Sequence, residues 1–359
     1  MAGVFGHLNL AATERAFNAT IGQRLIFDAA TEYINRANAE LAAALAIFVS
    51  RSTSDFKLRY KLPGGGYLQE RGPDGRYGAV KAQGSWDVAF PLRDYGAMIA
   101  GNDVAMAYMT IAELDNHIST IVAQNVNTVR HQILRRLFKN TTDTFVDDIH
   151  GSLTIQPLAN GDSVTYPPVI GSASEATETH YAESSYAESA ISDTNDPYEV
   201  IVPELEEHFG TPTGGSNIVT FINDSARAET QALTDFFEVN DNYIRTGANT
   251  DVPINLPSTP GRIIGRHKAG TWISVWNFIP SNYALGVHLE ADPPLIRRID
   301  PADTGLGDGL QLVAEDMEFP FEESVWRHRF GIGCGNRLNG YVMEFGVGGT
   351  YTIPTAYQS

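Results

Sequence analysis

The spacing of hydrophobic residues first follows a helical repeat and then changes to a strand repeat. From residue 21 to residue 49, hydrophobic side chains recur at steps of three and four, which predicts an amphipathic helix. In Phe56–Leu62, hydrophobic residues alternate with Lys and Arg, and Trp86–Leu92 contains a second alternating run. Two runs of this kind predict a half-buried antiparallel pair of strands.

The residues between these two runs are rich in turn formers. Three glycines follow one another at 64–66, and a Gly-Pro-Asp-Gly sequence occupies 72–75. Together the segments predict a hairpin of roughly 40 residues, which is too long for an ordinary connection in a compact domain. We therefore expect this hairpin to rest on another subunit.

A third periodic segment predicts an unusually long helix. Hydrophobic residues recur at steps of three and four from Val104 to Leu137. Asn102 or Asp103 can cap its start, and Arg135 and Arg136 suit the negative end of the helix dipole. The expected length is about 55 Å. Because the hydrophobic positions do not form clean heptads with paired charges, we expect packing along a sheet rather than a coiled coil.

The rest of the chain predicts shorter elements. Residues 150–200 are poor in hydrophobic residues, and the Pro167-Pro168 pair interrupts any run. Short helices are predicted at 203–210 and 225–238, and strands at 218–222, 272–279, 283–288, 324–332 and 338–345, the last two as a pair.

The charges are unevenly distributed. The formal net charge is -18. Because nucleic-acid binding through phosphates requires a basic surface, general tight binding of nucleic acid is not expected. Between residues 141 and 240 the only Lys or Arg is Arg227, whereas residues 50–93 carry eight. This contrast predicts electrostatic attraction between copies of the chain, with simply solvated faces as the alternative interpretation.

No motif predicts catalysis. The Asp-Thr-Gly triplet at 303–305 matches the core of aspartic proteases, but its neighbours predict a surface turn. The glycines within 331–335 lack the third glycine and the helix of a dinucleotide-binding loop. The Glu-Glu-His sequence at 206–208 has no second histidine four residues away. We therefore predict no enzyme activity, no cofactor and no catalytic or metal-binding residue.

Two local segments and the order of the elements resemble one known family. Residues 322–333 (EESVWRHRFGIG) combine an aromatic and arginine-rich strand with a Gly-x-Gly turn, and residues 203–222 lead from an acidic helix to a buried strand. Both segments, and the sequence of arm, hairpin, long helix, acidic segment and closing strands, resemble the HK97-like major capsid proteins of tailed bacteriophages. The resemblance implies an α+β fold with an N-terminal arm, an E-loop hairpin, a P-domain with a spine helix and antiparallel strands, and an α/β A-domain.

The resemblance also implies domain limits and contacts. The expected regions are 1–49 (N-terminal arm and helix), 50–95 (E-loop hairpin), 96–150 (P-domain with spine helix), 151–315 (A-domain, with some return to the P-domain) and 316–359 (C-terminal P-domain strands). Since the hairpin starts near residue 50, we expect scaffolding to be a separate protein or absent. The predicted inter-subunit contacts are Lys57, Arg59, Lys61, Arg71, Arg76, Lys81, Trp86 and Phe90.

The implied function is structural. Hexamers and pentamers of the chain would form an icosahedral shell that encloses double-stranded DNA without sequence-specific binding. The implied partners are further copies of the chain and a portal protein at one vertex, with separate scaffolding and decoration proteins as further candidates. The expected location is the virion, after assembly in the host cytoplasm and without a membrane. An encapsulin-like nanocompartment shell is the alternative, and a soluble α/β hydrolase is a remote one.

Overall fold

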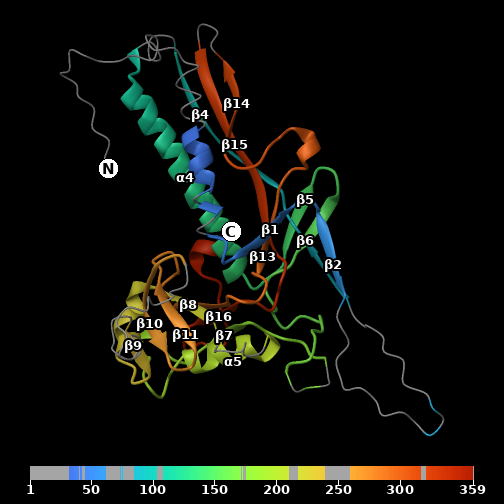
Figure 1. Cartoon of the computed structure of the whole chain (residues 1–359), viewed down its shortest axis with the longest axis vertical. Helices are drawn as coiled ribbons and strands as arrows, with labels where there is room; N and C mark the ends of the chain where they lie inside the picture. The colour runs from blue at the N-terminus through green and yellow to red at the C-terminus, as the bar shows by residue number, and fades with distance from the viewer. Residues whose placement is uncertain are drawn as a thin grey trace. The chain divides into compact units, whose positions relative to one another are not determined.

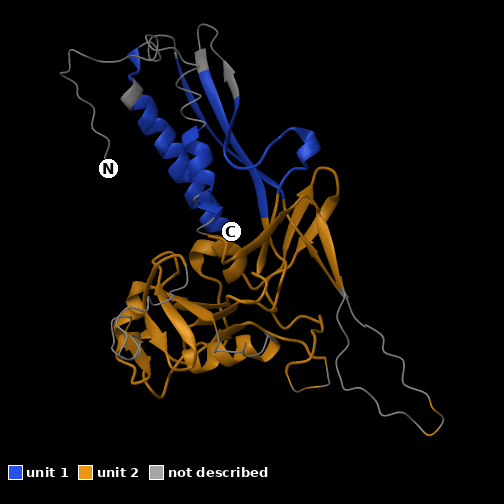
Figure 2. Ribbon diagram, in the orientation of Figure 1, with its two compact units in different colours: residues 1–43, 92–132, 299–331 blue, residues 44–91, 133–298, 332–359 orange. Residues whose placement is uncertain are grey.

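The structure is a computed structural model that divides into two compact units (Figure 1, Figure 2). The residues that it describes are 32–39, 41–42, 45–61, 73, 75, 85–102, 108–170, 172, 175–209, 217–238, 259–316 and 321–358. Unit 1 comprises residues 1–43, 92–132 and 299–331, and unit 2 comprises residues 44–91, 133–298 and 332–359.

Unit 1 contains an antiparallel sheet with one long strand at its centre. β15 (Phe321–Cys334) is flanked by β4 (Arg93–Asn102) and β14 (Gln311–Asp316), as Figure 1 shows. Along β15, Ser324, Trp326, His328 and Phe330 are buried, while the residues between them are partly exposed. This period of two is the burial pattern of a sheet with one covered face.

The long helix α4 (Ile111–Phe138) covers that face in unit 1. The shared hydrophobic cluster contains Ile34, Ile99, Leu114, Ile118, Ile121, Val122, Leu310 and Trp326. The predicted packing of a long helix along a sheet is therefore confirmed. The predicted cap residues do not lie at the start of α4: Asn102 is the last residue of β4, and Asp103 lies outside the described residues. Thr110 Oγ1 accepts the amide hydrogen of Glu113, and Glu113 Oε2 accepts that of Thr110, which is a capping box. Residues 32–39 form a further helical segment, inside the predicted helix at 21–49.

Unit 2 is built around a seven-stranded sheet. Most neighbours are antiparallel. Two pairs are parallel: β8 (Ile218–Ile222) with β11 (Thr271–Val275), and β16 (Tyr341–Glu344) with β7 (Tyr181–Glu183). The predicted strands at 218–222 and 283–288 are confirmed with their bounds. The order is β7 (Tyr181–Glu183), β16 (Tyr341–Glu344), β12 (Tyr283–His288), β8 (Ile218–Ile222), β11 (Thr271–Val275), β10 (Arg262–His267) and β9 (Phe236–Glu238).

Helix α5 (Tyr198–Phe209) packs against this sheet (Figure 1). It approaches β12 closely because Gly286 has no side chain: a Cβ there would lie 3.0 Å from Leu205 Cδ1. The predicted start at residue 203 is wrong. Asp196 Oδ1 accepts the amide hydrogen of Tyr198, and this cap starts the helix five residues earlier, so Pro203 lies inside it.

Two other predictions for these strands are wrong. The predicted helix at 225–238 is only partly formed, since α6 (Arg227–Gln231) is followed by a turn and then by β9, which pairs with β10. The predicted pairing of 324–332 with 338–345 does not occur, because β16 has β12 and β7 as its two neighbours. In both cases pairing with strands distant in sequence determined the structure that the segment adopts.

Unit 2 also contains two two-stranded sheets and a parallel strand pair that belongs to a five-stranded sheet. β2 (Lys57–Lys61) and β3 (Ser85–Ala89) are antiparallel, which confirms the predicted pairing of the two alternating runs. β5 (Asp143–Asp147) and β6 (Gly151–Ile155) form a short hairpin, and β1 (Val49–Thr53) runs parallel to β13 (Leu295–Arg298). The 3-10 turns are η1 (Glu188–Ala190), η2 (Asp224–Ala226) and η4 (Thr355–Tyr357) in unit 2, and η3 (Ala302–Thr304) in unit 1.

The Asp-Thr-Gly triplet forms the surface turn that its sequence context predicts. Residues 302–305 are exposed, and Gly305 adopts a left-handed conformation (φ 69°) that ends η3. Within the described part of the chain, no helix combines the length and the hydrophobicity that crossing a lipid bilayer requires.

Candidate functional site

The outward face of the β2–β3 pair carries a three-residue charge cluster. Arg59 stands directly opposite Asp87 in the ladder and donates from Nε to Oδ1 at 2.6 Å and from Nη2 to Oδ2 at 2.9 Å. Lys57 Nζ lies 2.6 Å from Asp87 Oδ2. The hydrogen bonds from Arg59 and Lys57 hold the pKa of Asp87 well below its usual range. This cluster therefore presents two cations and one anion to solvent, a net charge of one positive unit.

The other face of the pair is aromatic and packs inside the chain. Trp86 stacks on Tyr60 with ring centroids 5.3 Å apart, and Tyr166 lies at the same centroid distance on a tilted plane. Phe90, just after β3, is fully buried and lies against Ile296 and the backbone of Gly333. These contacts fix the root of the hairpin to the body of unit 2.

The predicted inter-subunit residues are thus only partly brought together. Lys57 and Arg59 share Asp87, Trp86 is half-buried, and Phe90 belongs to the chain's own core. Lys61 lies in β2 opposite Ser85, but its side chain is not among those that the structure describes. Arg71, Arg76 and Lys81 lie outside the described residues. The predicted role of all eight residues in contacts between copies stays a prediction.

The β5–β6 hairpin is a second exposed feature, which was not predicted from the sequence. Val146 is 71% exposed and Ile149 is 84% exposed, while Phe56 stacks on His150 at a centroid distance of 3.8 Å. Asp147 closes the turn by accepting the amide hydrogens of Ile149 and His150. Two β-prone runs around Asp-Asp-Ile-His-Gly were the available signal. Two exposed hydrophobic side chains thus lie close together in sequence, Val146 near the end of β5 and Ile149 in the turn.

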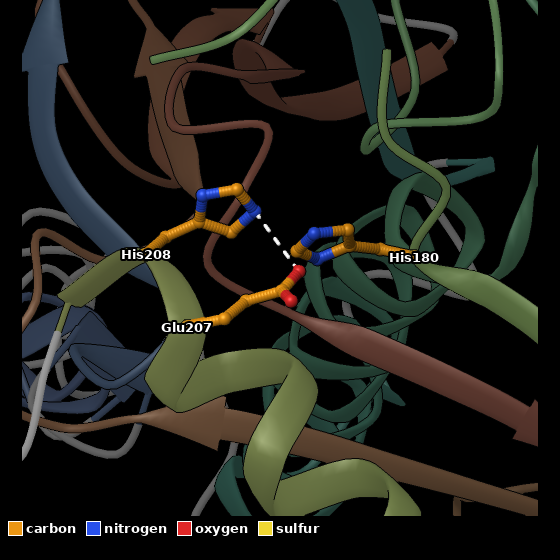
Figure 3. Close-up of side chains that lie close together, drawn as sticks. All are labelled: His180, Glu207 and His208. Atoms are coloured by element: carbon orange, nitrogen blue, oxygen red, sulfur yellow. Dashed lines mark ion pairs between the residues drawn. The ribbon is translucent and has the colours of Figure 1, made fainter. Parts of the chain in front are cut away.

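A third group of residues joins segments that are distant in sequence. His180 precedes β7, whereas Glu207 and His208 lie in the last turn of α5. One potential ligand atom from each side chain lies within 4.8 Å of the others (Figure 3). His208 Nε2 is 3.3 Å from Glu207 Oε1, and the two imidazole rings stack with centroids 5.7 Å apart. Sequence spacing could not reveal this cluster because the second histidine comes from another element.

Burial sets the protonation of this cluster. Desolvation lowers the pKa of His180 and of His208 to about 4 in each case. It also raises the pKa of Glu207 to about 7, with the nearby carboxyls of Glu204 and Glu178 adding to the effect. Near neutral pH both imidazoles are therefore uncharged, with a lone pair available on one nitrogen of each ring.

Comparison with known proteins finds similar structures but no relative by sequence. No protein-family model matches the chain, and no curated protein matches it. A solved structure from Mycobacterium phage Patience superposes with a TM-score of 0.70 at 18% identity, covering 98% of each chain. The mature capsid of bacteriophage PhiM1 gives 0.47 at 9% identity, covering 96% of this chain and 91% of that one, and the capsid of cyanophage Pam1 gives 0.47 at 12% identity, covering 84% and 89%.

The chain therefore shares its fold, over almost its whole length, with a phage structure. The predicted α+β fold is confirmed at this level. The five predicted domain limits stay predictions.

Proposed function

We propose that this chain is the major capsid protein of a tailed bacteriophage, a structural protein that forms hexamers and pentamers. These would tile an icosahedral shell around packaged double-stranded DNA. The observation that carries the proposal is the superposition on the Mycobacterium phage structure with a TM-score of 0.70 over 98% of both chains. The order of elements along the sequence, which resembles the HK97-like capsid family, supports the same assignment.

Assembly requires attraction between copies that each carry a net charge of -18. A basic hairpin against the acidic stretch at 141–240 of a neighbour would supply it locally. Because Asp87 neutralises one of the two positive charges of Lys57 and Arg59, the root of the hairpin contributes less electrostatic attraction than its composition suggests. The basic residues Arg71, Arg76 and Lys81 are then the better candidates for contacts with the neighbouring subunit.

Hydrophobic contact would come from the β5–β6 turn. Burying the exposed side chains of Val146 and Ile149 against a neighbour would contribute about 1.5–3 kcal/mol each. Such a contact is short-ranged and not weakened by salt, whereas the attraction of the exposed basic hairpin is screened. The hydrophobic contact would thus supply affinity, and the charged hairpin would set the register between neighbouring subunits.

The remaining partners follow from the proposed role. A portal protein would occupy one vertex, and a separate scaffolding protein and a decoration protein are further candidates. The acidic chain would enclose DNA without binding its phosphates tightly. Such binding is driven by the release of counterions from DNA when Lys and Arg side chains neutralise its phosphates. The protein would then be a component of the virion, assembled in the host cytoplasm.

Negative-stain electron microscopy of the purified chain tests the proposal. Closed shells of uniform size are expected, and a protein that stays monomeric at high concentration would contradict the capsid assignment. Shells that carry cargo protein instead of packaged DNA in infected or producing cells would identify an encapsulin-like compartment.

A deletion of residues 63–83, closed by a short Gly-Ser turn, tests the hairpin separately. The change retains the β2–β3 ladder and the Asp87 pairs, so folded subunits are expected that no longer close into shells. Circular dichroism and the melting temperature check the fold. The Asp55→Asn variant, which alters an exposed residue before β2, is the control and should assemble normally. Normal shells from the deletion variant would remove the hairpin tip from the mechanism.

A further inference from the structure

We propose that His180, Glu207 and His208 form a binding site for a divalent transition-metal ion of the Zn²⁺ type. Figure 3 shows the two imidazole rings and the carboxylate converging, His180 from the segment before β7 and the other two from α5. The three potential ligand atoms lie within 4.8 Å of one another. Ligands of one tetrahedral zinc ion are about 3.4 Å apart, so side-chain movements of roughly 1 Å would complete the site.

The hydrogen bonding of His180 leaves the ring in the form that binds metal. Its Nδ1 lies 2.9 Å from the carbonyl oxygen of Gly340. A carbonyl oxygen can only accept, so Nδ1 carries the hydrogen and Nε2 keeps its lone pair. Metal-bound histidines usually donate their other ring N–H to a carbonyl or carboxylate in this way, which fixes the tautomer and the orientation of the ring.

The Nε2 atom of His180 is also buried without a partner. His180 is fully buried, and among the described residues no hydrogen-bond partner reaches its Nε2. Leaving a buried acceptor unsatisfied destabilises the folded chain. A metal ion at the cluster would satisfy this nitrogen.

The surrounding charges favour a cation. The carboxyls of Glu178 and Glu204 interact electrostatically with that of Glu207, so the three repel one another when ionised. Glu207 and His208 lie in the last turn of α5, where the helix dipole places partial negative charge. A divalent ion would relieve both effects. The Glu207 side chain is 32% exposed, so an ion can reach the cluster from solvent.

The ligand set indicates the class of ion. Two imidazoles and one carboxylate suit Zn²⁺, and also Co²⁺ or Ni²⁺, better than Ca²⁺ or Mg²⁺, which prefer oxygen ligands. Three protein ligands leave a fourth position for water. Because the cluster joins the end of α5 to the segment before β7, bound metal would tie these two parts of unit 2 together.

Isothermal titration of the full-length, untagged chain with ZnCl₂ tests the site, and Co²⁺ absorption reports its coordination. One ion per chain is expected, with an increase in melting temperature on addition of Zn²⁺. His180→Asn keeps a donor for the Gly340 carbonyl but removes Nε2, and Glu207→Gln removes the carboxylate. Each variant is expected to bind Zn²⁺ at least about 10–100-fold more weakly and to lose the thermal shift.

Two matched variants serve as controls. Glu206→Gln removes the same charge one residue away, and His117→Asn removes an exposed histidine on α4. Both should bind Zn²⁺ within about twofold of the wild type, since neither belongs to the cluster. The proposal would be overturned if the wild type showed no saturable Zn²⁺ binding. It would also be overturned if the wild type, His180→Asn and Glu207→Gln bound Zn²⁺ equally well. If His180→Asn does not fold, Glu207→Gln decides, because its side chain is partly exposed.

Discussion

A buried ion pair joins three segments of unit 2 and offers a sharp test of the packing. Arg298 Nη1 donates to Asp147 Oδ2 at 2.8 Å and to the carbonyl oxygen of Phe90 at 2.9 Å. Arg298 is 5% exposed and Asp147 is 7% exposed. The pair therefore connects β13, the β5–β6 turn and the residue that follows β3. The perturbation is Arg298→Met, which keeps an unbranched side chain but removes the charge.

The expected loss is large because the carboxylate stays behind. Removing one partner of a buried pair leaves an uncompensated charge and costs about 3–5 kcal/mol. In an Asp147→Asn background no charge remains, and Arg298→Met costs chiefly the hydrogen bond to Phe90, about 1–3 kcal/mol. The double-mutant cycle should therefore give a coupling energy of about 2 kcal/mol.

Urea unfolding of the unassembled subunit measures these free energies. Three of the four tryptophans, Trp86, Trp272 and Trp276, lie in unit 2, so fluorescence mainly follows its unfolding. The control is Lys268→Met. Lys268 pairs with Asp235 at 3.2 Å, but it is 68% exposed, and an exposed pair contributes about 0–1 kcal/mol.

The same pair predicts a dependence on pH. Burial alone would raise the pKa of Asp147, but the amides of His150 and Ile149 and the Arg298 guanidinium together hold it below its usual value. A carboxyl with a lowered folded-state pKa contributes stability above its unfolded pKa of about 4. This contribution is lost as the pH falls through the folded-state pKa. The difference between wild type and Arg298→Met should therefore shrink below about pH 4.

Two results would refute this reasoning. Arg298→Met would cost no more than Lys268→Met if water reached the pair and screened it. An equal cost with Asp or Asn at position 147 would mean that the loss comes from packing of the Arg298 side chain and not from its charge.

Two smaller changes test the close approach of α5 and the start of α4. Gly286→Ala should destabilise unit 2 by about 1–3 kcal/mol in urea unfolding, because the added Cβ would meet Leu205 at 3.0 Å, whereas Gly348→Ala, with only ordinary contacts, should change little. Thr110→Ala removes the capping box and should cost about 0.5–2 kcal/mol with loss of helical circular dichroism at the first turn, while Thr120→Ala on the exposed face of α4 should be nearly neutral.

The local sequence pattern predicted those elements in which the hydrophobicity of each side chain matches its burial. The strand Ile218–Ile222 is hydrophobic throughout and is buried at every position, and the alternating runs of β2 and β3 pair as expected. β4 was missed for a physical reason. Its outward positions include Gly96 and Met98, so the alternation is blurred. Gly96 is required there because a Cβ would lie 2.9 Å from the Trp326 carbonyl oxygen, a contact made only in the folded sheet.

The candidate sites divide in the same way. The basic residues and aromatic residues of the hairpin could be named from sequence, but their partner Asp87 and the burial of Phe90 could not. The candidate metal cluster could not be found from sequence by a search for two histidines on one helix. His180 and His208 meet only because β7 and α5 fold together, and no spacing rule connects them.

The placement of β15 between β4 and β14 has a consequence for synthesis on the ribosome. β4 is made roughly 230 residues before the strand that pairs with it, so at about 5–20 residues per second it waits roughly 12–46 s. During that time its hydrogen-bonding edge and the side chain of Met98 are open to other chains. Because the sheet of unit 1 can close only when residues 321–330 have emerged, the nascent chain is expected to need protection by a chaperone until translation is almost finished.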